Sequence, residues 1–219
     1  MSDLIIVGAG KIARTINNYI CDSYKVLGFM VDADFIHEQE IDGLKVFSTE
    51  KYANKLISSD CRFLIAIGYT EMNEVRQRIF QNFRAKGANF INFIHPSCSI
   101  ARGVEIGCNN VLLENTVVQP FSNIGNNNYF WSNTVLSHGA CVNDGNWIAS
   151  GSIISGDCDV GSNNFFGVNT SLAHNVSIGD RNFVGANCLQ THNMKDSQVY
   201  VKNSHVQCDS KTFLRISGV

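Results

Sequence analysis

A six-residue hydrophobic period runs through the second half of the chain and constrains its fold more than any other feature. Stepping by six from residue 94 to residue 184 meets sixteen consecutive positions that are all aliphatic or phenylalanine. With 44% hydrophobic residues in the chain, such a run has a chance probability of about two in a million. This period fits neither an α-helix nor a heptad coil, but it fits short strands joined by tight corners. We therefore expect a parallel β-helix of hexapeptide repeats.

A second period, of eighteen residues, is superposed on the first. Three hexads therefore make one coil. Both glycine and asparagine tolerate left-handed backbone angles at corners, and stacked asparagines can hydrogen-bond between coils about 4.8 Å apart. We predict a triangular prism of roughly five coils within residues 94–219, followed by an irregular tail, with one hydrophobic side chain per face pointing inward. The two columns that define the coil are Gly107, Gly125, Gly161 and Gly179, and Asn110, Asn128, Asn146, Asn164 and Asn182.

Residues 1–93 show the alternation of strands and helices that is typical of a small parallel α/β domain. Buried strands are predicted at residues 4–7, 26–31 and 63–67, and a glycine turn and a helix follow the first of them. A second helix follows the third strand and ends near Gly87. Its apolar stripe consists of Met72, Val75, Ile79 and Phe83. We expect a Rossmann-like domain that ends near residue 93.

The glycine turn fits the pattern G-x-G-x-x-A, with Gly8, Gly10 and Ala13. In this pattern the glycines let a phosphate approach the backbone, and the helix N-terminus favours its negative charge. Asp32 follows the second strand, where a carboxylate can accept hydrogen bonds from a ribose. Two alternatives remain open. The glycines could serve tight packing alone, or the domain could bind NAD, which its short length disfavours because dinucleotide folds need two such halves.

Charge and composition exclude several classes of function. The formal net charge is −2 and no run of Lys or Arg is present, which argues against nucleic acid as a partner. The N-terminus lacks the pattern of a signal peptide, and no apolar run is long enough to cross a bilayer, so we expect a cytoplasmic protein without membrane insertion. The eight cysteines form no Cys-x-x-Cys pair and are expected to be reduced apolar fillers.

Three stretches of the chain resemble the PglD/NeuD family of bacterial sugar acyltransferases. They are residues 63–68 (Phe-Leu-Ile-Ala-Ile-Gly), residues 93–97 (Phe-Ile-His-Pro-Ser), and the repeats from Ser137-His138 to residues 167–169 (Gly-Val-Asn). The resemblance covers nearly the whole chain. It implies a left-handed β-helix, a homotrimer, and acetyl-CoA bound in the groove between adjacent β-helices. It also implies that the N-terminal domain binds a nucleotide-linked amino sugar, for which the candidate residues are Gly8, Gly10, Lys11, Asp32, Gly68 and Tyr69.

The resemblance assigns roles to two residues of the β-helix. His138 matches the family's catalytic histidine, and Gly156 matches a glycine whose backbone N–H faces the thioester oxygen. They are one coil apart, so they stack as neighbours. A neutral imidazole suits the removal of a proton from an attacking amine, and a backbone N–H suits a developing oxyanion. Gly156 and His174 are the candidate residues for the coenzyme groove.

The chain departs from the family pattern at two places. Gly139 stands where the family has an acidic residue directly after the histidine, so we take Asp157, one coil and one residue away, as the candidate that orients His138. The family's Pro-Ala-Lys element is absent, because residues 199–203 are Val-Tyr-Val-Lys-Asn. Coenzyme contacts of that tail are therefore not transferred.

His138, His174 and His192 fall in one column of the repeat, which raises the question of a metal site. Coil spacing predicts that His138 and His174 lie about 9.6 Å apart, too far to share an ion within one subunit. A trimer could assemble ligands across its boundary, but no close histidine pair is present in the sequence. We expect no metal.

The sequence thus predicts an acetyl-CoA-dependent N-acetyltransferase acting on a nucleotide-linked 4-amino-4,6-dideoxysugar in cell-surface glycan (O-antigen) biosynthesis. Alternatives within enzymes are O-acetylation of a sugar such as a sialic acid, and transfer of a longer acyl group. The absence of an acid beside His138 favours nitrogen, because a hydroxyl needs stronger base assistance. A non-catalytic nucleotide-sugar-binding protein and a metal-dependent hydratase are the alternatives from other classes.

Overall fold

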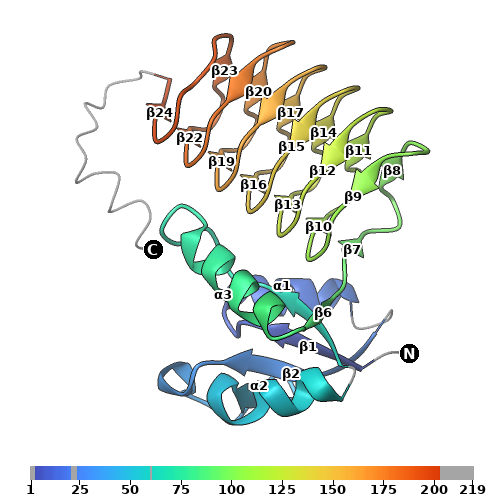
Figure 1. The fold of residues 1–219 in the computed structure, drawn as a ribbon, viewed down its shortest axis with the longest axis vertical. Helices are drawn as coiled ribbons and strands as arrows, with labels where there is room; N and C mark the ends of the chain where they lie inside the picture. Colours follow the sequence, from blue (N-terminus) through green and yellow to red (C-terminus); the bar gives the residue numbers. More distant parts are fainter. Residues whose placement is uncertain (1–2, 21–23, 60, 203–219) are drawn as a thin grey trace. The chain divides into compact units, whose positions relative to one another are not determined.

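The computed structural model describes residues 3–20, 24–59 and 61–202 (Figure 1). The chain divides into two compact units. One unit comprises residues 1–68 and 78–92, and the other residues 69–77 and 93–219. Segment 69–77 therefore groups with the repeats, although it precedes them in sequence. The part of the predicted irregular tail that follows residue 202, including Asn203, lies outside the described residues.

The α/β unit contains a six-stranded sheet with the order β3-β4-β2-β1-β5-β6, in which only the pair β3 and β4 is antiparallel. The chain moves from β1 outward to β2 and β4 and then returns to the other side of β1 at β5, so the carboxyl ends of β1 and β5 flank a topological switch point. The elements are β1 (Asp3–Val7), α1 (Lys11–Ile20), β2 (Lys25–Val31), the 3₁₀ helix η1 (Ala33–Phe35), β3 (Glu40–Ile41), β4 (Leu44–Ser48), α2 (Thr49–Ser58), β5 (Arg62–Ile65), α3 (Glu74–Ala85) and β6 (Asn89–Phe90).

The strands predicted at residues 4–7, 26–31 and 63–67 are confirmed as β1, β2 and β5, although β5 ends at Ile65. The inclusion of Met72 in the second predicted helix is wrong. This helix, α3, begins at Glu74, and Met72 precedes it with a left-handed φ of 52°. The hairpin β3–β4 and helix α2 come in addition to the predicted elements. None of the helices in the described ranges has the length and apolar character needed to span a membrane.

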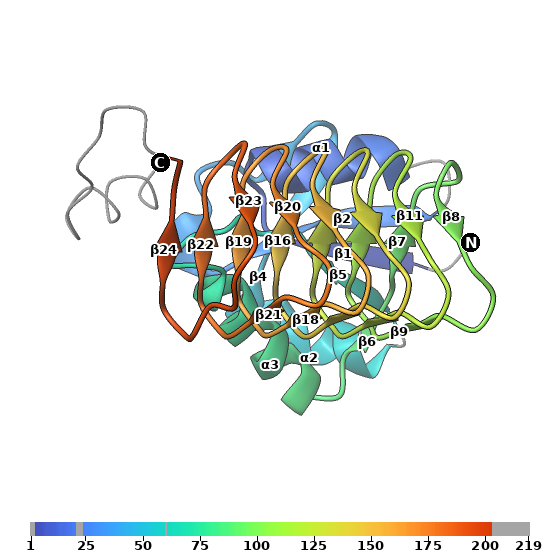
Figure 2. The ribbon, with the colours of Figure 1, turned by 90° about the horizontal axis from the view of Figure 1, so that it is seen from above.

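The repeats form a parallel β-helix with three sheets, which confirms the predicted fold class (Figures 1 and 2). The first sheet contains β7 (Phe93–Ile94), β10 (Val111–Leu112), β13 (Tyr129–Phe130), β16 (Trp147–Ile148), β19 (Phe165–Phe166), β22 (Phe183–Val184) and β24 (Val199–Tyr200). The second contains β8 (Ser99–Ile100), β11 (Val117–Val118), β14 (Val135–Leu136), β17 (Ile153–Ile154), β20 (Ser171–Leu172) and β23 (Leu189–Gln190). The third contains β9 (Glu105–Ile106), β12 (Asn123–Ile124), β15 (Cys141–Val142), β18 (Asp159–Val160) and β21 (Ser177–Ile178).

The second residue of nearly every short strand points into the prism and forms one continuous core. From Leu112 to Val184 the residues of the predicted hexad column are at most 3% exposed. The prediction is wrong at the start of the column, where Ile94 is 37% exposed because no coil precedes it. Paired strands are offset by eighteen residues until the final coil, where Phe183 pairs with Val199, sixteen residues on. The eighteen-residue register therefore holds for the coils that carry the candidate site.

The outward residues give the three sheets different surfaces. We call the first sheet the aromatic face, because its outward positions include Tyr129, Trp147, Phe165 and Phe183. The second is the apolar face, with outward Val117, Val135, Ile153 and Leu189. The third is the polar face, with outward Glu105, Asn123, Asp159 and Ser177. Each face can therefore meet a different kind of neighbour.

The predicted asparagine column forms a buried ladder along the prism. The side-chain oxygen of Asn128 accepts the backbone N–H of Asn146 at 2.8 Å, and that of Asn146 accepts the N–H of Asn164 at 2.8 Å. The predicted role of these asparagines in left-handed corners is wrong, because the left-handed residues lie one position earlier, as at Asn127. The ladder residues are instead kept by their hydrogen bonds between coils.

The predicted glycine column is also explained by packing and not by backbone angle. None of these glycines has a left-handed φ. A Cβ at Gly107 would lie 2.5 Å from the carbonyl oxygen of Gly125, and a Cβ at Gly161 would lie 2.7 Å from the carbonyl carbon of Gly179. Only a residue without a side chain fits this close approach of successive coils.

Segment 69–77 packs on the aromatic face through a fully buried arginine. Arg76 donates hydrogen bonds to Asn73 Oδ1 at 2.9 Å and to the carbonyl oxygen of Gly145 at 2.8 Å, and its guanidinium lies 5.0 Å from the centre of the Tyr129 ring. Burial lowers the pKa of Arg76 to about 10, so the guanidinium stays charged at neutral pH. Asn73 adds a hydrogen bond to the carbonyl oxygen of Asn164 at 3.0 Å. These contacts attach the segment to the β-helix.

We predict that Asn146→Ala lowers the free energy of unfolding by about 1–3 kcal/mol, because it leaves the buried N–H of Asn164 without its acceptor. The matched control is Asn123→Ala, in which the same residue type is removed from an exposed position of the polar face. Urea unfolding followed by circular dichroism measures both variants. An equal effect of the two substitutions would contradict a structural role of the ladder.

Candidate functional site

The two glycines of the turn between β1 and α1 have different roles. Gly8 has a φ of 115°, donates its N–H to the carbonyl oxygen of Met30 at 2.8 Å, and would place a Cβ 2.7 Å from the carbonyl oxygen of Ala66. Packing alone therefore explains Gly8. A Cβ at Gly10 would meet nothing within 4 Å, and Gly10 is exposed immediately before α1. Of the two, Gly10 is the one left for a ligand at the helix N-terminus.

The other predicted nucleotide-binding residues of the α/β unit also follow the carboxyl ends of parallel strands. Lys11 is the exposed first residue of α1, Asp32 is exposed directly after β2, and Gly68 follows β5. The structure thus brings Gly8, Gly10, Lys11, Asp32 and Gly68 to one edge of the sheet, at the switch point where open α/β sheets bind ligands.

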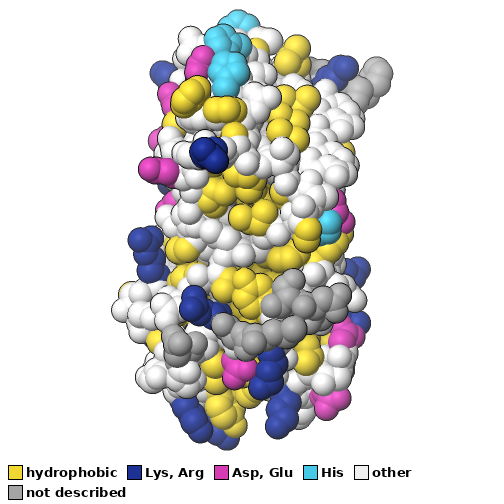
Figure 3. Space-filling model, turned by 90° about the vertical axis from the view of Figure 1, so that its right-hand side faces the viewer, with side chains coloured by type: hydrophobic (Ala, Val, Ile, Leu, Met, Phe, Trp, Pro, Cys, Tyr) yellow, Lys and Arg dark blue, Asp and Glu magenta, His cyan; other side chains and the backbone are white. Residues whose placement is uncertain are grey.

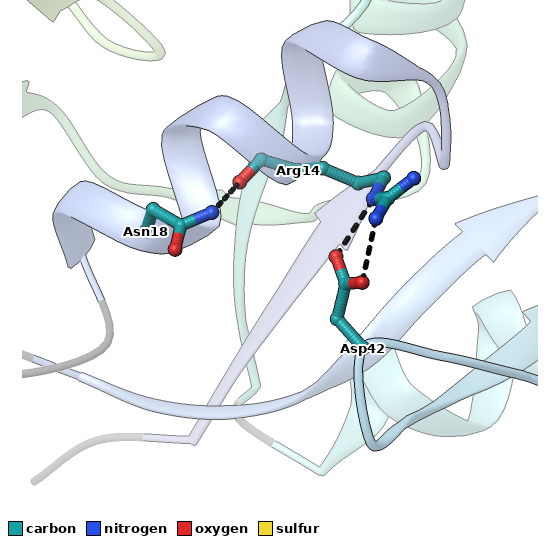
Figure 4. A network of polar contacts seen from close by, with 3 residues as sticks. All are labelled: Arg14, Asn18 and Asp42. Carbon is teal, nitrogen blue, oxygen red and sulfur yellow. Dashed lines mark hydrogen bonds and ion pairs between the residues drawn. The ribbon is translucent and has the colours of Figure 1, made fainter.

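Two acidic side chains stabilise loops near this edge. Glu50, at the start of α2, accepts the backbone N–H of Ala33, next to Asp32, at 3.1 Å. The hydroxyl of Ser48 donates to Glu50 at 2.6 Å, and this bond, more than the backbone contacts, lowers the pKa of Glu50. Arg14, on α1, donates twice to Asp42 in the β3–β4 turn, both at 2.7 Å (Figure 4). The loop after β2 and the β3–β4 hairpin are therefore each tied to a helix.

Tyr69 belongs with the β-helix and not with the α/β unit. Its ring lies 4.7 Å from the ring centre of Phe165 and 5.2 Å from that of Trp147. The structure therefore does not group Tyr69 with the other five predicted nucleotide-binding residues.

The predicted catalytic residues lie at the corner that joins the apolar face to the polar face. His138, Gly156 and His174 occupy equivalent positions on three successive coils, and both histidines are exposed. The centres of the two imidazole rings are 6.4 Å apart, and not the 9.6 Å expected from coil spacing. The rings are closer because the coil between them carries a glycine, over which they lean towards each other. Figure 3 shows histidine side chains gathered at the top of the view.

Gly156 fits beneath the His138 ring only because it has no side chain. A Cβ at position 156 would lie 2.6 Å from Cε1 and 2.7 Å from Nε2 of His138. Gly156 is buried, and within the described part of the chain its backbone N–H has no hydrogen-bond acceptor. An imidazole and an unpaired backbone donor therefore lie against each other.

Asp157 lies on the coil after Gly139 and directly over it. A Cβ at Gly139 would collide with the Asp157 carboxylate, so the glycine makes room for an acidic group from the next coil. The backbone N–H of Asp157 donates to the carbonyl oxygen of His138 at 3.0 Å. Its carboxylate lies 3.7 Å from His174 Nε2, and both side chains are more than half exposed. In this structure the ion-pair contact of Asp157 is therefore with His174.

A groove of about 690 Å³ runs along the polar face from a position three residues after His138. Its lining includes Cys141, Asp159, Ser177, Met194, Lys195 and Asp196. Its volume is in the range of small-ligand sites. The sequence gives no sign of this groove, because its lining combines one face of three successive coils with the irregular final coil, whose path the repeat does not predict. Within residues 3–20, 24–59 and 61–202, no group of three or more His, Cys, Asp or Glu side chains is placed to hold a metal ion.

Comparison with known proteins gives one family match and several fold matches. Residues 3–83 match the family described as the PglD N-terminal domain. No curated protein sequence matches the chain.

Three solved structures share the fold over nearly the whole chain. A histidine-to-asparagine variant of perosamine N-acetyltransferase from Caulobacter crescentus, in complex with CoA and GDP-perosamine, has a TM-score of 0.84 at 23% identity and covers 95% of this chain and 98% of that one. The acetyltransferase domain of PglB from Neisseria gonorrhoeae, in complex with acetyl coenzyme A, has a TM-score of 0.82 at 20% identity and covers 92% and 96%. WeeI from Acinetobacter baumannii has a TM-score of 0.74 at 17% identity and covers 93% and 98%. At these identities the likeness establishes the fold.

We predict that Gly8→Ala and Gly10→Ala separate packing from ligand binding. Gly8→Ala should lower the free energy of unfolding by about 1–3 kcal/mol, because its Cβ collides with backbone at a left-handed φ. Gly10→Ala should leave stability unchanged but abolish the rise in melting temperature caused by a bound nucleoside diphosphate. Thermal unfolding with and without UDP, dTDP or GDP tests this. A wild-type rise retained by Gly10→Ala would remove Gly10 from the site.

Proposed function

Residues 3–83 match the family described as the PglD N-terminal domain, and from this premise we propose that the protein transfers an acetyl group from acetyl-CoA to the amino group of a nucleotide-linked 4-amino-4,6-dideoxyhexose. This match supports the resemblance that the sequence motifs indicate. The β-helix and the α/β unit supply the two surfaces that such a reaction needs, one for each substrate.

The observation that carries the proposal is the contact between His138 and Gly156. The neutral imidazole accepts a proton from the sugar amine while the amine nitrogen attacks the thioester carbonyl carbon. The N–H of Gly156 donates to the oxyanion that develops on the carbonyl oxygen. The C–N bond forms in this attack. The C–S bond then breaks, and the coenzyme leaves as a thiolate that takes the proton from His138 and is released as a thiol. Both groups come from the prism surface, since no long insertion interrupts the coils.

The solved structures of similar fold support this choice of substrates. Perosamine N-acetyltransferase was crystallised with CoA and GDP-perosamine, and the PglB acetyltransferase domain with acetyl coenzyme A. An amino sugar linked to a nucleotide and an acetyl donor are therefore the first pair to test. We propose an amine acceptor, because a hydroxyl acceptor needs stronger base assistance than an exposed imidazole alone supplies. We also propose that the reaction belongs to cell-surface glycan synthesis and takes place in the cytoplasm.

Asp157 and His174 are proposed to support the same corner. The carboxylate of Asp157 takes the place that a side chain at position 139 would occupy, directly after His138, so it supplies negative charge beside the base. His174 lies across Gly156 from His138 and is proposed to border the acyl donor. The groove on the polar face, with Lys195 in its lining, is proposed to hold the rest of the coenzyme.

The acceptor nucleotide is proposed to bind at the switch point of the α/β sheet. Gly10 and Lys11 would receive its phosphates at the N-terminus of α1, and Asp32 would accept hydrogen bonds from its ribose. Gly68 and Tyr69 follow β5 and are proposed to contact the nucleotide sugar.

The apolar face supports the proposed homotrimer. Ile153 and Leu189 are 40% and 59% exposed on this face, and both side chains point outward along one line with Val135. The aromatic face is already occupied by segment 69–77, and the polar face carries charged and amide groups. Because His138 lies at the edge of the apolar face, packing that face against a second copy would place the reaction at a subunit boundary.

We predict that His138→Ala lowers kcat for acetyl transfer by about 10²- to 10⁴-fold, because the general base is lost. The assay supplies acetyl-CoA with UDP-, dTDP- and GDP-linked 4-amino-4,6-dideoxyhexoses and follows the release of free thiol. His192→Ala, in the same column but beyond His174, is the matched control and should retain wild-type turnover. Unchanged turnover in His138→Ala would show that the base is assigned wrongly, and no thiol release with any acceptor would refute the proposed function.

We predict that Ile153→Asp dissociates the trimer, because it buries a charge in an apolar contact between subunits. Light scattering at a fixed protein concentration should give the mass of three chains for the wild type and of one chain for the variant. The control, Asn123→Asp, introduces the same residue on the polar face and should remain trimeric. A wild-type mass of one chain would contradict the proposed assembly.

A further inference from the structure

One corner residue of the β-helix does not fit the pattern of all the others. Among the described residues, the left-handed corners of the repeats occur every six residues from 103 to 187, with one more at Ser197, and all except Phe121 carry glycine, asparagine, aspartate or another polar residue. They are Gly103, Asn109, Asn115, Phe121, Asn127, Asn133, Gly139, Gly145, Gly151, Asp157, Asn163, Asn169, Asn175, Arg181, Asn187 and Ser197. Phe121 has a φ of 67°, which is rare for a bulky side chain.

Packing within the chain does not explain this phenylalanine. Its side chain is 83% exposed, the most exposed of the large hydrophobic residues described. An asparagine or glycine would adopt the same backbone angle at lower cost, as at the equivalent position Gly139. The fold therefore accepts an unfavourable residue that buries almost no area in return.

The position of Phe121 relates it to the candidate catalytic corner. Phe121 and Gly139 are eighteen residues apart and stack on successive coils, and the N–H of Gly139 donates to the carbonyl oxygen of Pro120 at 3.1 Å. Phe121 thus lies at the same corner as His138, on the coil before it. Gly156 and His174 lie on the two coils after that of His138. Along this corner, the coil of His138 therefore has Phe121 on the coil before it and the proposed oxyanion donor, Gly156, on the coil after it.

We propose that Phe121 binds the acceptor, by stacking its ring on the apolar face of the amino-sugar ring. This inference rests on the proposed function, in which Gly156 holds the thioester of the donor. The donor then occupies the coils after His138, and the amine must reach the imidazole from the side of the preceding coil, where Phe121 stands. Aromatic rings bind apolar surfaces at small conformational cost, and a dideoxyhexose offers such a surface.

The test compares Phe121→Asn with Phe121→Trp in the full-length protein. Phe121→Asn should raise the KM for the nucleotide-linked amino sugar about tenfold while the KM for acetyl-CoA stays unchanged. Its melting temperature should be no lower than that of the wild type, because asparagine suits the left-handed corner. Phe121→Trp keeps an aromatic ring and should retain a KM for the acceptor close to the wild-type value.

Four outcomes would overturn the inference. An unchanged acceptor KM in Phe121→Asn would show that the ring does not bind the sugar. Loss of the oligomer in this variant, measured by light scattering, would make Phe121 a subunit contact instead. A raised KM for acetyl-CoA would place the ring on the donor. If the wild-type protein transfers no acetyl group to any acceptor, the proposed function fails and this inference fails with it.

Discussion

The hydrogen bonding between successive coils determines where every surface residue of the β-helix lies. Buried asparagines accept the backbone N–H of the next coil, as Asn146 does from Asn164, and strands pair with an offset of eighteen residues. Residues one coil apart in sequence are therefore neighbours in space. Because of this register, residues that are eighteen positions apart in the sequence stack on one another at the surface. The candidate site at the corner therefore depends on the asparagine ladder, although no ladder residue belongs to the site.

Within that register, the absence of a side chain at two glycines shapes the candidate site. Gly156 leaves a gap between His138 and His174, the centres of the two rings lie 6.4 Å apart over it, and its N–H has no acceptor among the described residues. Gly139 similarly leaves space for the carboxylate of Asp157. The candidate site is thus assembled from three adjacent coils. A Cβ at Gly156 would occupy the space of the His138 ring, and a Cβ at Gly139 would occupy that of the Asp157 carboxylate.

The α/β unit shows how far a motif can be interpreted from sequence. The strands β1, β2 and β5 and the location of Gly8, Gly10 and Asp32 at their carboxyl ends follow from hydrophobic runs bounded by glycine and aspartate. The different roles of the two glycines do not, because they depend on what lies opposite each Cα. The backbone of Ala66 lies opposite Gly8, and open space lies opposite Gly10. Helix α2 was not predicted, although Tyr52, Ala53, Leu56 and Ile57 recur at helical spacing along it.

The sequence by itself determined the β-helix, the eighteen-residue register and the column that joins His138 to Gly156, because these depend on a local period that each coil repeats. Only the tertiary structure decided what that period does not encode. It buries Arg76, a charged residue of segment 69–77, completely against the aromatic face, and it brings the rings of two histidines closer than their coil spacing. It also leaves Phe121 exposed at a strained corner. Such features depend on which side chains meet across coils and segments, and so on contacts between residues far apart in the chain.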